Sequence, residues 1–192
     1  MNINKFISET IQQSINVKQN ILADRSFIAL IAQVANAAVK VYRSGHKIML
    51  AGNGGSAADA QHLAGELVNR FRFDRPALPA IALSTDTSVM TSIANDSSFN
   101  NVFARQVQAL GVKGDMFIGI STSGGSPNVL KAMEQCCKMK IISVGLTGKN
   151  SAKMEKRCDY CFAVPSEDTP RIQEAHITIG HILCELIESS LF

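Results

Sequence analysis

The spacing of apolar residues divides the chain into segments with helical period and short runs that are apolar throughout. Residues 3–21 carry Ile3, Ile7, Ile11 and Ile15 at steps of four, which predicts a helix with one narrow apolar stripe. Such a stripe can cover the protein's own sheet or contact another subunit, and both alternatives stay open. A second helical pattern follows Asp24, a typical N-cap residue, and ends at Gly45.

Five short apolar runs have the length of buried strands rather than of helices. Further helical patterns separate them, and each of the first three runs ends in small polar residues. This alternation predicts an α/β fold with a parallel sheet, helices on both faces, and ligands at the carboxyl ends of the strands. The expected strands are residues 48–51, 80–83, 116–120, 141–146 and 160–164.

Composition and charge exclude several classes of function. The 192 residues have a net charge of +3 and no basic run longer than two residues, so a nucleic-acid partner is not expected. No apolar run approaches the ~20 residues that a membrane span needs, and the N-terminus lacks the pattern of a signal peptide. The odd count of five cysteines fits reduced thiols. We therefore expect one soluble, cytoplasmic domain without a membrane partner.

The single C-x-x-C motif, Cys158 and Cys161, lies in the apparent strand CDYCFAV, which includes the last expected strand. Side chains three residues apart in a strand point to opposite faces of the sheet. On this basis we expect neither a zinc site nor redox chemistry at this pair.

The turn after the first expected strand is rich in glycine. Residues 52–57 match G-x-G-x-x-G/A, which on its own is a weak dinucleotide signal. The acidic residue that binds ribose should close a second strand about 20 residues later, but Asp74 lies in a proline-flanked loop. A nicotinamide cofactor is therefore disfavoured. A triphosphate-binding loop is excluded, because no Lys-Ser/Thr pair follows the glycines.

The turn after the third expected strand is the better phosphate site. Gly124 and Gly125 let the backbone approach a ligand, and a helix N-terminus at Pro127 favours an anion. The turn contains no Lys or Arg, so its neutral donors suit one phosphate monoester better than a triphosphate with magnesium. The alternative is that its hydroxyls serve only as turn and N-cap groups. These hydroxyls belong to Ser121, Thr122, Ser123 and Ser126.

Two expected helices each carry a spaced polar pair. His62 and Glu66 are four residues apart, and Gln173 and His181 share a face through Ile177. If the helices face each other, two imidazoles, one carboxylate and one amide oxygen come together. Such a set can bind a divalent metal such as zinc, or perform acid–base chemistry.

Four segments in order carry a family resemblance: AGNGGSAADAQHLAGEL, IANDSSF, GISTSGGSPNV and RIQEAHITIGHIL. They resemble the sugar isomerase (SIS) family, and within it the branch that isomerises phosphorylated seven-carbon sugars. The resemblance covers nearly the whole chain. It implies a single SIS domain over residues 1–192, with a five-stranded parallel sheet flanked by helices in a flavodoxin-like three-layer sandwich. It also implies a homotetramer with active sites between subunits, in which the N-terminal helices, about residues 1–44, pack on the domain and on neighbouring subunits.

The reaction implied by this resemblance converts sedoheptulose 7-phosphate to D-glycero-D-manno-heptose 7-phosphate through an enediol. It is the first step towards the ADP-heptose of the lipopolysaccharide core. By the same resemblance, Glu66 is the general base and His181 the general acid. The implied ligands of one zinc ion per subunit are His62, Glu66, Gln173 and His181. The implied substrate-binding residues are Asn53, Gly54, Gly55, Glu66, Asn95, Asp96, Ser121, Thr122, Ser123, Ser126 and Gln173.

The dual assignment of Glu66 and His181 contains a conflict, because neither residue can coordinate a metal and transfer protons freely at the same moment. Either the metal is displaced during turnover, or it polarises the substrate oxygens while one residue moves. Two other functions also fit the family. One is a non-catalytic tetrameric scaffold that binds the replication initiator protein and lacks the base and acid. The other is a sugar-phosphate sensor, which needs the serine-rich turn but not Glu66. The presence of both Glu66 and His181 favours the enzyme.

Overall fold

All five apolar runs form strands in the computed structural model, which describes residues 1–192. The strands pair in the order β2-β1-β3-β4-β5, and every pair is parallel. Ile48 and Leu50 of β1 lie in one core, whereas Met49 and Ala51 lie in the other. Burial on both faces explains why the strands are continuous apolar runs in the sequence. The strands are β1 Ile48–Gly52, β2 Ala80–Ala82, β3 Met116–Ile120, β4 Ile142–Thr147 and β5 Tyr160–Ala163.

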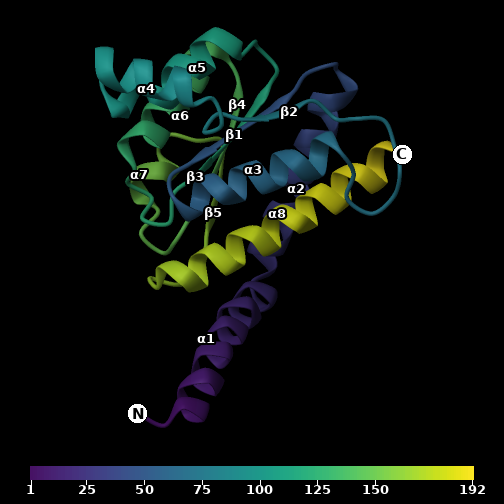
Figure 1. Ribbon diagram of the computed structural model, residues 1–192. Coiled ribbons are helices and arrows are strands. Elements are labelled where there is room, and N and C mark those ends of the chain that lie inside the picture. Colours follow the sequence, from purple (N-terminus) through teal and green to yellow (C-terminus); the bar gives the residue numbers. More distant parts are fainter.

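Helices cover both faces of the sheet, so the α/β prediction is confirmed (Figure 1). The larger core lies between the sheet and α2, α3 and α8. The smaller core lies under α5, α6 and α7, with α4 at the periphery. The helices are α1 Ile3–Ala23, α2 Arg25–Arg43, α3 Gly55–Val68, α4 Thr87–Asp96, α5 Val102–Leu110, α6 Pro127–Met139, α7 Ala152–Glu155 and α8 Thr169–Leu191, with a short 3₁₀ turn η1 Phe99–Asn101.

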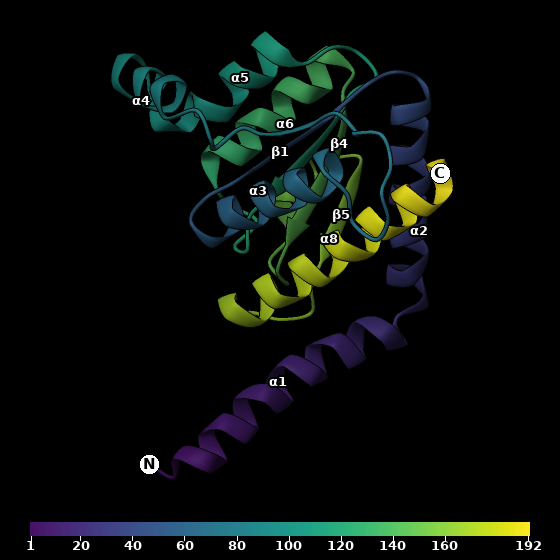
Figure 2. The same ribbon diagram turned by 45° about the vertical axis from the view of Figure 1, so that its right-hand side comes forward.

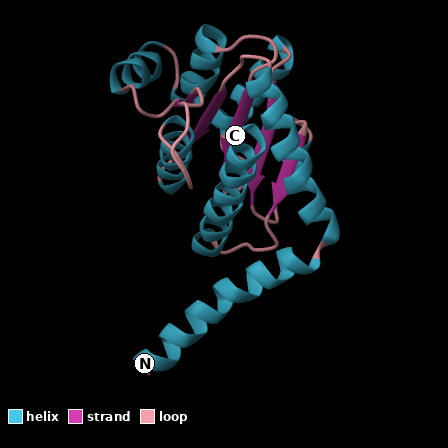
Figure 3. Ribbon diagram, turned by 90° about the vertical axis from the view of Figure 1, so that its right-hand side faces the viewer, coloured by secondary structure: helices cyan, strands magenta, loops and turns pink.

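The helix α1 projects away from the three layers, as Figures 2 and 3 show. Within α1 only Val17 is buried, and the four isoleucines of its stripe are 42–64% exposed. The stripe therefore does not cover the protein's own sheet, which leaves contact with another subunit as the open alternative. No single helix is both long and apolar enough to span a membrane. Only α1 and α2 taken together reach that length and composition, and they are bent by 80°.

The prediction that the side chains of Cys158 and Cys161 point to opposite faces of the sheet is wrong. Strand β5 begins at Tyr160, so Cys158 lies in the loop before the strand rather than within it. Both side chains pack against the smaller core, on the same side of the sheet. The alternation rule fails here because it applies only to residues that share one regular strand.

Candidate active site

The strand order reverses between β1 and β3, and the loops that leave these two strands form the site. In parallel α/β sheets such a switch point opens a crevice at the carboxyl ends of the strands. The loop after β1 leads through Asn53 and Gly54 into α3, and the loop after β3 is residues 121–126, here called the serine turn. Both loops were predicted to bind ligand, and the topology places them side by side.

A reciprocal pair of amides ties the two loops together. Asn53 Nδ2 donates to Asn128 Oδ1 at 2.9 Å, and Asn128 Nδ2 donates to Asn53 Oδ1 at 2.8 Å. Asn128 is buried in the first turn of α6, and its Oδ1 also accepts from the backbone N–H of Val129 at 3.0 Å. With its amide used in this way, Asn53 fixes the loop geometry in addition to any contact with substrate. Asn128 was not predicted from the sequence.

The serine turn brings its three serine hydroxyls close together. Ser121 Oγ lies 2.7 Å from Ser126 Oγ and 3.4 Å from Ser123 Oγ, and Ser123 Oγ accepts from the N–H of Gly125 at 3.2 Å. Gly124 has φ +63°, and a Cβ there would lie 2.5 Å from the carbonyl oxygen of Asn150, so only glycine fits. A hollow of about 690 Å³ opens beside the turn. It is lined by Ser123, Gly125, Ser126, Pro127, Asn150, Ala152 and Lys153.

The cluster of His62, Glu66 and His181, here called the His–Glu cluster, brings α3 and α8 together. The Nε2 atoms of His62 and His181 are 2.8 Å apart, and His62 Nε2 lies 3.3 Å from Glu66 Oε1. The ring of Phe71 packs on His181 with centroids 5.5 Å apart. Since the His62 side chain is 49% and that of Glu66 25% exposed, the cluster faces an open surface that a ligand can reach.

The donor set and spacing of the His–Glu cluster fit a divalent metal. All three ligand atoms lie within 4.8 Å of one another. A tetrahedral zinc ion holds its nitrogen ligands roughly 3.4 Å apart, close to the separation of the two Nε2 atoms. Without a metal, one imidazole must donate to the other, which is the arrangement of an acid–base pair. The geometry therefore supports both alternatives that the sequence left open.

Gln173 of α8 lies against the loop after β1. A Cβ on Gly55 would come within 2.5 Å of Gln173 Nε2, so the absence of a side chain at residue 55 makes room for this amide. Gln173 thus connects α8 to the start of α3, two helical turns from His181. The structure places Gln173 beside Gly55, outside the group of three closely spaced ligand atoms.

Asn95 and Asp96 are placed differently from the other predicted residues. They form the last turn of α4, where Asn95 Nδ2 donates to Asp96 Oδ1 at 2.9 Å, and both are exposed. Asp96 lines a separate hollow of about 390 Å³ with Ser97, Asn101 and Arg105. Within one chain these two side chains contact each other rather than the serine turn.

A buried ion pair between Arg75 and Glu188, which was not predicted, holds the backbone at Glu66 and Phe71. Glu188 is fully buried and accepts from Arg75 Nε at 2.8 Å and from the N–H groups of Phe71 and Arg72 at 2.9 and 2.7 Å. Arg75 Nη2 also donates to the backbone oxygen of Glu66 at 2.9 Å. Burial by itself raises the pKa of Glu188, but these N–H groups and the Arg75 charge lower it below its usual value. Glu188 could have been found from the sequence, because it is an acidic residue within the apolar face of the last helix.

A second unpredicted carboxyl lies one helical turn before His62. Asp59 is half-buried, and its Oδ2 has no hydrogen-bond partner. Burial raises the pKa of Asp59, and the nearby His62 opposes that shift.

Comparison with known proteins identifies the relatives of this chain. The SIS domain family matches residues 12–148. The phosphoheptose isomerase of Aneurinibacillus thermoaerophilus is 60% identical over 99% of this chain and 96% of its own length. Phosphoheptose isomerase 2 of Campylobacter jejuni is 58% identical over 100% of this chain and 95% of its own length.

A solved structure has the same fold over almost all of the chain. The structure of a phosphoheptose isomerase from Francisella tularensis superposes with a TM-score of 0.92 at 36% identity. It covers 98% of this chain and 100% of its own. Together with the family match, this similarity shows that the chain belongs to the SIS domain family, as its sequence motifs predicted.

Proposed function

We propose that this protein is an aldose–ketose isomerase that converts sedoheptulose 7-phosphate to D-glycero-D-manno-heptose 7-phosphate. The observation that carries the proposal is the His–Glu cluster, which joins a carboxylate and two imidazoles within 4.8 Å on a fold with a hydroxyl-rich turn at its switch point. The names of relatives at 60% and 58% identity over full length support the same reaction.

The serine turn binds the phosphate in this proposal. Ser121, Thr122, Ser123 and Ser126 supply hydroxyls, and the N-terminus of α6 adds backbone N–H groups and a favourable dipole. Asn53, Gly54 and Gly55 lie beside it on the loop after β1 and contact the sugar. Asn95 and Asp96 bind sugar hydroxyls, and they reach a bound sugar from the far side of the crevice or from a neighbouring subunit.

The proton transfers are assigned to Glu66 and His181. Glu66 removes a proton from C1 of the ketose while His181 donates one to the oxygen on C2, which gives the enediol. His181 then takes the proton from the oxygen on C1, and Glu66 returns its proton to C2, so both residues regain their starting states. The enediol is the same in both directions, so one pair of residues serves the forward and reverse reactions.

One zinc ion per subunit is part of the proposal, with His62, Glu66, Gln173 and His181 as ligands. The close spacing of the ligand atoms of His62, Glu66 and His181 supports it. Bound there, zinc would polarise the oxygens on C1 and C2 and lower the cost of the charge that develops on them. His62 has no other assigned part in the reaction, and its Nε2 already points at His181, so a ligand role accounts for its position.

A homotetramer with active sites between subunits is part of the proposal. The isoleucine stripe of α1 is exposed, and the His–Glu cluster lies on an open surface rather than in a closed cavity. A neighbouring subunit would cover both, and the N-terminal helices would pack on it. We further propose that the protein acts in the cytoplasm, in the first step of ADP-heptose synthesis for the lipopolysaccharide core. The scaffold alternative, binding the replication initiator protein, has no need of the intact His–Glu cluster and is not favoured.

The proposal is tested with Glu66→Gln and a matched control, Glu185→Gln, on α8. Glu185 pairs with Arg72 at the surface and has no part in the reaction. Glu66→Gln should abolish turnover of sedoheptulose 7-phosphate while leaving its binding, measured by calorimetry, within a few-fold of the parent protein. Glu185→Gln should keep turnover. Full activity in Glu66→Gln would overturn the assignment of the base.

A further inference from the structure

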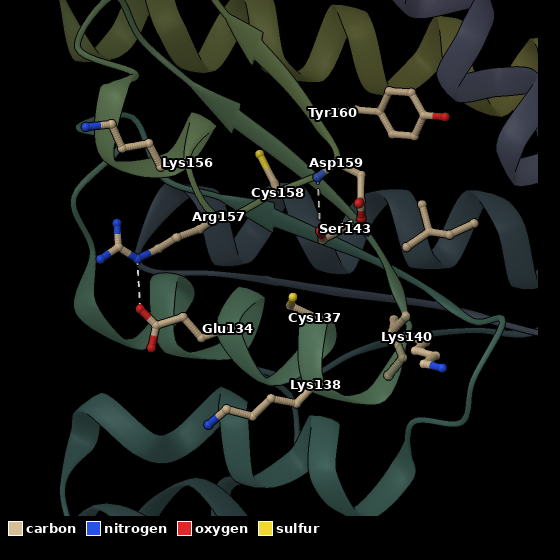
Figure 4. A pocket seen from close by; sticks show the side chains of 12 residues that line it. Glu134, Cys137, Lys138, Lys140, Ser143, Lys156, Arg157, Cys158, Asp159 and Tyr160 are labelled. Carbon is tan, nitrogen blue, oxygen red and sulfur yellow. Dashed lines mark hydrogen bonds and ion pairs between the residues drawn. The ribbon is translucent and has the colours of Figure 1, made fainter.

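A second cavity lies at the opposite ends of the strands from the candidate active site. It has a volume of about 810 Å³ and opens at the amino ends of β4 and β5, between the C-terminal end of α6 and the loop after α7 (Figure 4). Figure 4 shows Cys158 on the loop that leads into β5, next to Arg157. None of the residues assigned to isomerisation lines this cavity.

The walls of this cavity carry excess positive charge. Arg157 is neutralised by Glu134, with Nε and Oε1 2.8 Å apart. Lys138, Lys140 and Lys156 line the cavity without forming an ion pair. The remaining acid, Asp159, accepts from the N–H and hydroxyl of Ser143 at 2.7 and 2.8 Å and keeps its negative charge. The four cationic side chains outnumber the two acids by two, and this excess favours an anionic ligand.

Two thiols meet at the wall of the cavity. Cys158 is half-buried, lines the cavity, and lies with its Sγ 3.2 Å from where a Cβ on Gly145 would be. Cys161 pairs in register with the same Gly145 across the β4–β5 ladder. Both side chains pack against the smaller core, and the Cys158 thiol donates to the backbone oxygen of Met154 at 3.2 Å. Gly145 thus leaves space for the two neighbouring side chains on the same face of the sheet.

The two thiols are chemically unequal. Of the pair, only Cys158 lines the cavity. The neighbouring Cys161 thiol lowers the pKa of Cys158 in spite of burial, and the proximity of Cys158 raises the pKa of Cys161. Burial raises the pKa of Cys136 and Cys184 to about 12, so these residues are poor nucleophiles. Cys137 is exposed on the wall of the same cavity but has no thiol partner.

We propose that Cys158 and Cys161 form a thiol–disulfide exchange site for small anionic disulfides, with Cys158 as the attacking and Cys161 as the resolving residue. The Cys158 thiolate attacks one sulfur of the disulfide, and the S–S bond breaks to release one thiolate. The Cys161 thiolate, formed by loss of its proton to water, then attacks Cys158 Sγ and displaces the second thiolate. The net change oxidises the two cysteines to a disulfide and reduces one small disulfide to two thiols. This chemistry is separate from the proposed isomerisation.

The test uses the full chain with Cys137→Ser as background, treated with oxidised glutathione and analysed by peptide mass spectrometry. The background protein should form an internal Cys158–Cys161 disulfide without retained glutathione. Addition of Cys161→Ser should trap one glutathione on Cys158, and addition of Cys158→Ser should leave the protein unmodified. Glutathione on Cys136 or Cys184 instead, or no modification of Cys158, would overturn the proposal. Disulfide mapping in the background protein requires no substitution of Cys158 or Cys161. The test therefore remains even if one of the variants at these residues fails to fold.

The role of the lysines is tested by the rate of the first step. The rate with oxidised glutathione should fall severalfold between low salt and ~0.5 M salt, whereas neutral 2-hydroxyethyl disulfide should show no such fall. Lys156→Met should lower the glutathione rate severalfold, and Lys5→Met on the projecting α1 should not. Equal salt dependence for the two disulfides would overturn the assignment of an anionic ligand.

Discussion

The serine turn and the His–Glu cluster are the two halves of the proposed site, but they are built in opposite ways. The serine turn is a single stretch of six residues whose serine hydroxyls bond to one another and to its own backbone. The His–Glu cluster joins residues up to 119 positions apart, on α3 and α8. A local turn keeps its geometry through short-range bonds, whereas the cluster depends on how two helices pack. The two halves should therefore respond differently to mutation.

The largest effect is expected for His181→Ala. Loss of the acid should lower kcat by about 10²–10⁴-fold with KM within a few-fold of the parent value, because general acid–base catalysis acts on the transition state. Steady-state kinetics with sedoheptulose 7-phosphate measure this split. A rise in KM with normal kcat would instead make His181 a binding residue.

The buried ion pair of Arg75 and Glu188 should have the next largest effect, and this effect is on stability rather than on turnover. Glu188→Gln leaves the Arg75 guanidinium, whose side chain is 1% exposed, without its counter-charge. We expect a loss of about 3–5 kcal/mol in the free energy of unfolding, measured by urea denaturation. The exposed pair of Arg72 and Glu185 is the matched control, and Glu185→Gln should cost under about 1 kcal/mol. Equal losses would contradict the supporting role of Glu188.

His176, a buried histidine, connects α8 to the end of β4, next to the serine turn. His176 Nε2 donates to the backbone oxygen of Thr147 at 3.1 Å, and its Nδ1 is buried without a partner. The Thr147 hydroxyl lies 2.7 Å from where a Cβ on Gly124 would be. Burial lowers the pKa of His176 to about 4 from 6.5, because the charged ring would lack solvent and a second acceptor.

The pH dependence follows from this shift. Between pH 6.5 and about 4 the unfolded chain binds a proton at His176 that the folded chain does not. Stability is therefore complete above pH 6.5 and falls as the pH is lowered, by about 3 kcal/mol from this group. Urea denaturation at pH 7, 5.5 and 4.5 measures the slope. His176→Gln should flatten it, and an unchanged slope would show that other groups cause the loss.

The smallest effect is expected in the serine turn. Ser126→Ala removes one hydroxyl from a turn that keeps its other donors, so KM should rise about 5–10-fold with little change in kcat, which corresponds to about 1 kcal/mol of binding. Thr85→Ser, in the loop after β2, preserves a hydroxyl that bonds Ala82 and is the control. A kcat loss as large as that of His181→Ala would mean that the two halves are not separable.

The same contrast decides how much could be predicted from the sequence. The strands and the serine turn were predicted because apolar runs and clustered hydroxyls are contiguous in the chain. Helical spacing placed His62 beside Glu66, but it could not show that His181 faces them, since that depends on packing. Asn128, Arg75 and Glu188 were missed because their partners are 75 to 117 residues away. The placement of Cys158 on the face opposite Cys161 was wrong because Cys158 lies in the loop before β5, where strand alternation does not apply.

The central claim is that the His–Glu cluster is the reacting centre of an isomerase that holds zinc. The most direct test is turnover of sedoheptulose 7-phosphate by metal-stripped protein, with and without added zinc, followed by NMR of the sugar. We predict little turnover without zinc, recovery with zinc in the parent protein, and no recovery in His62→Ala. Turnover that is equal with and without zinc would contradict the metal assignment but keep Glu66 and His181 as base and acid. No turnover in either condition would contradict the claim as a whole.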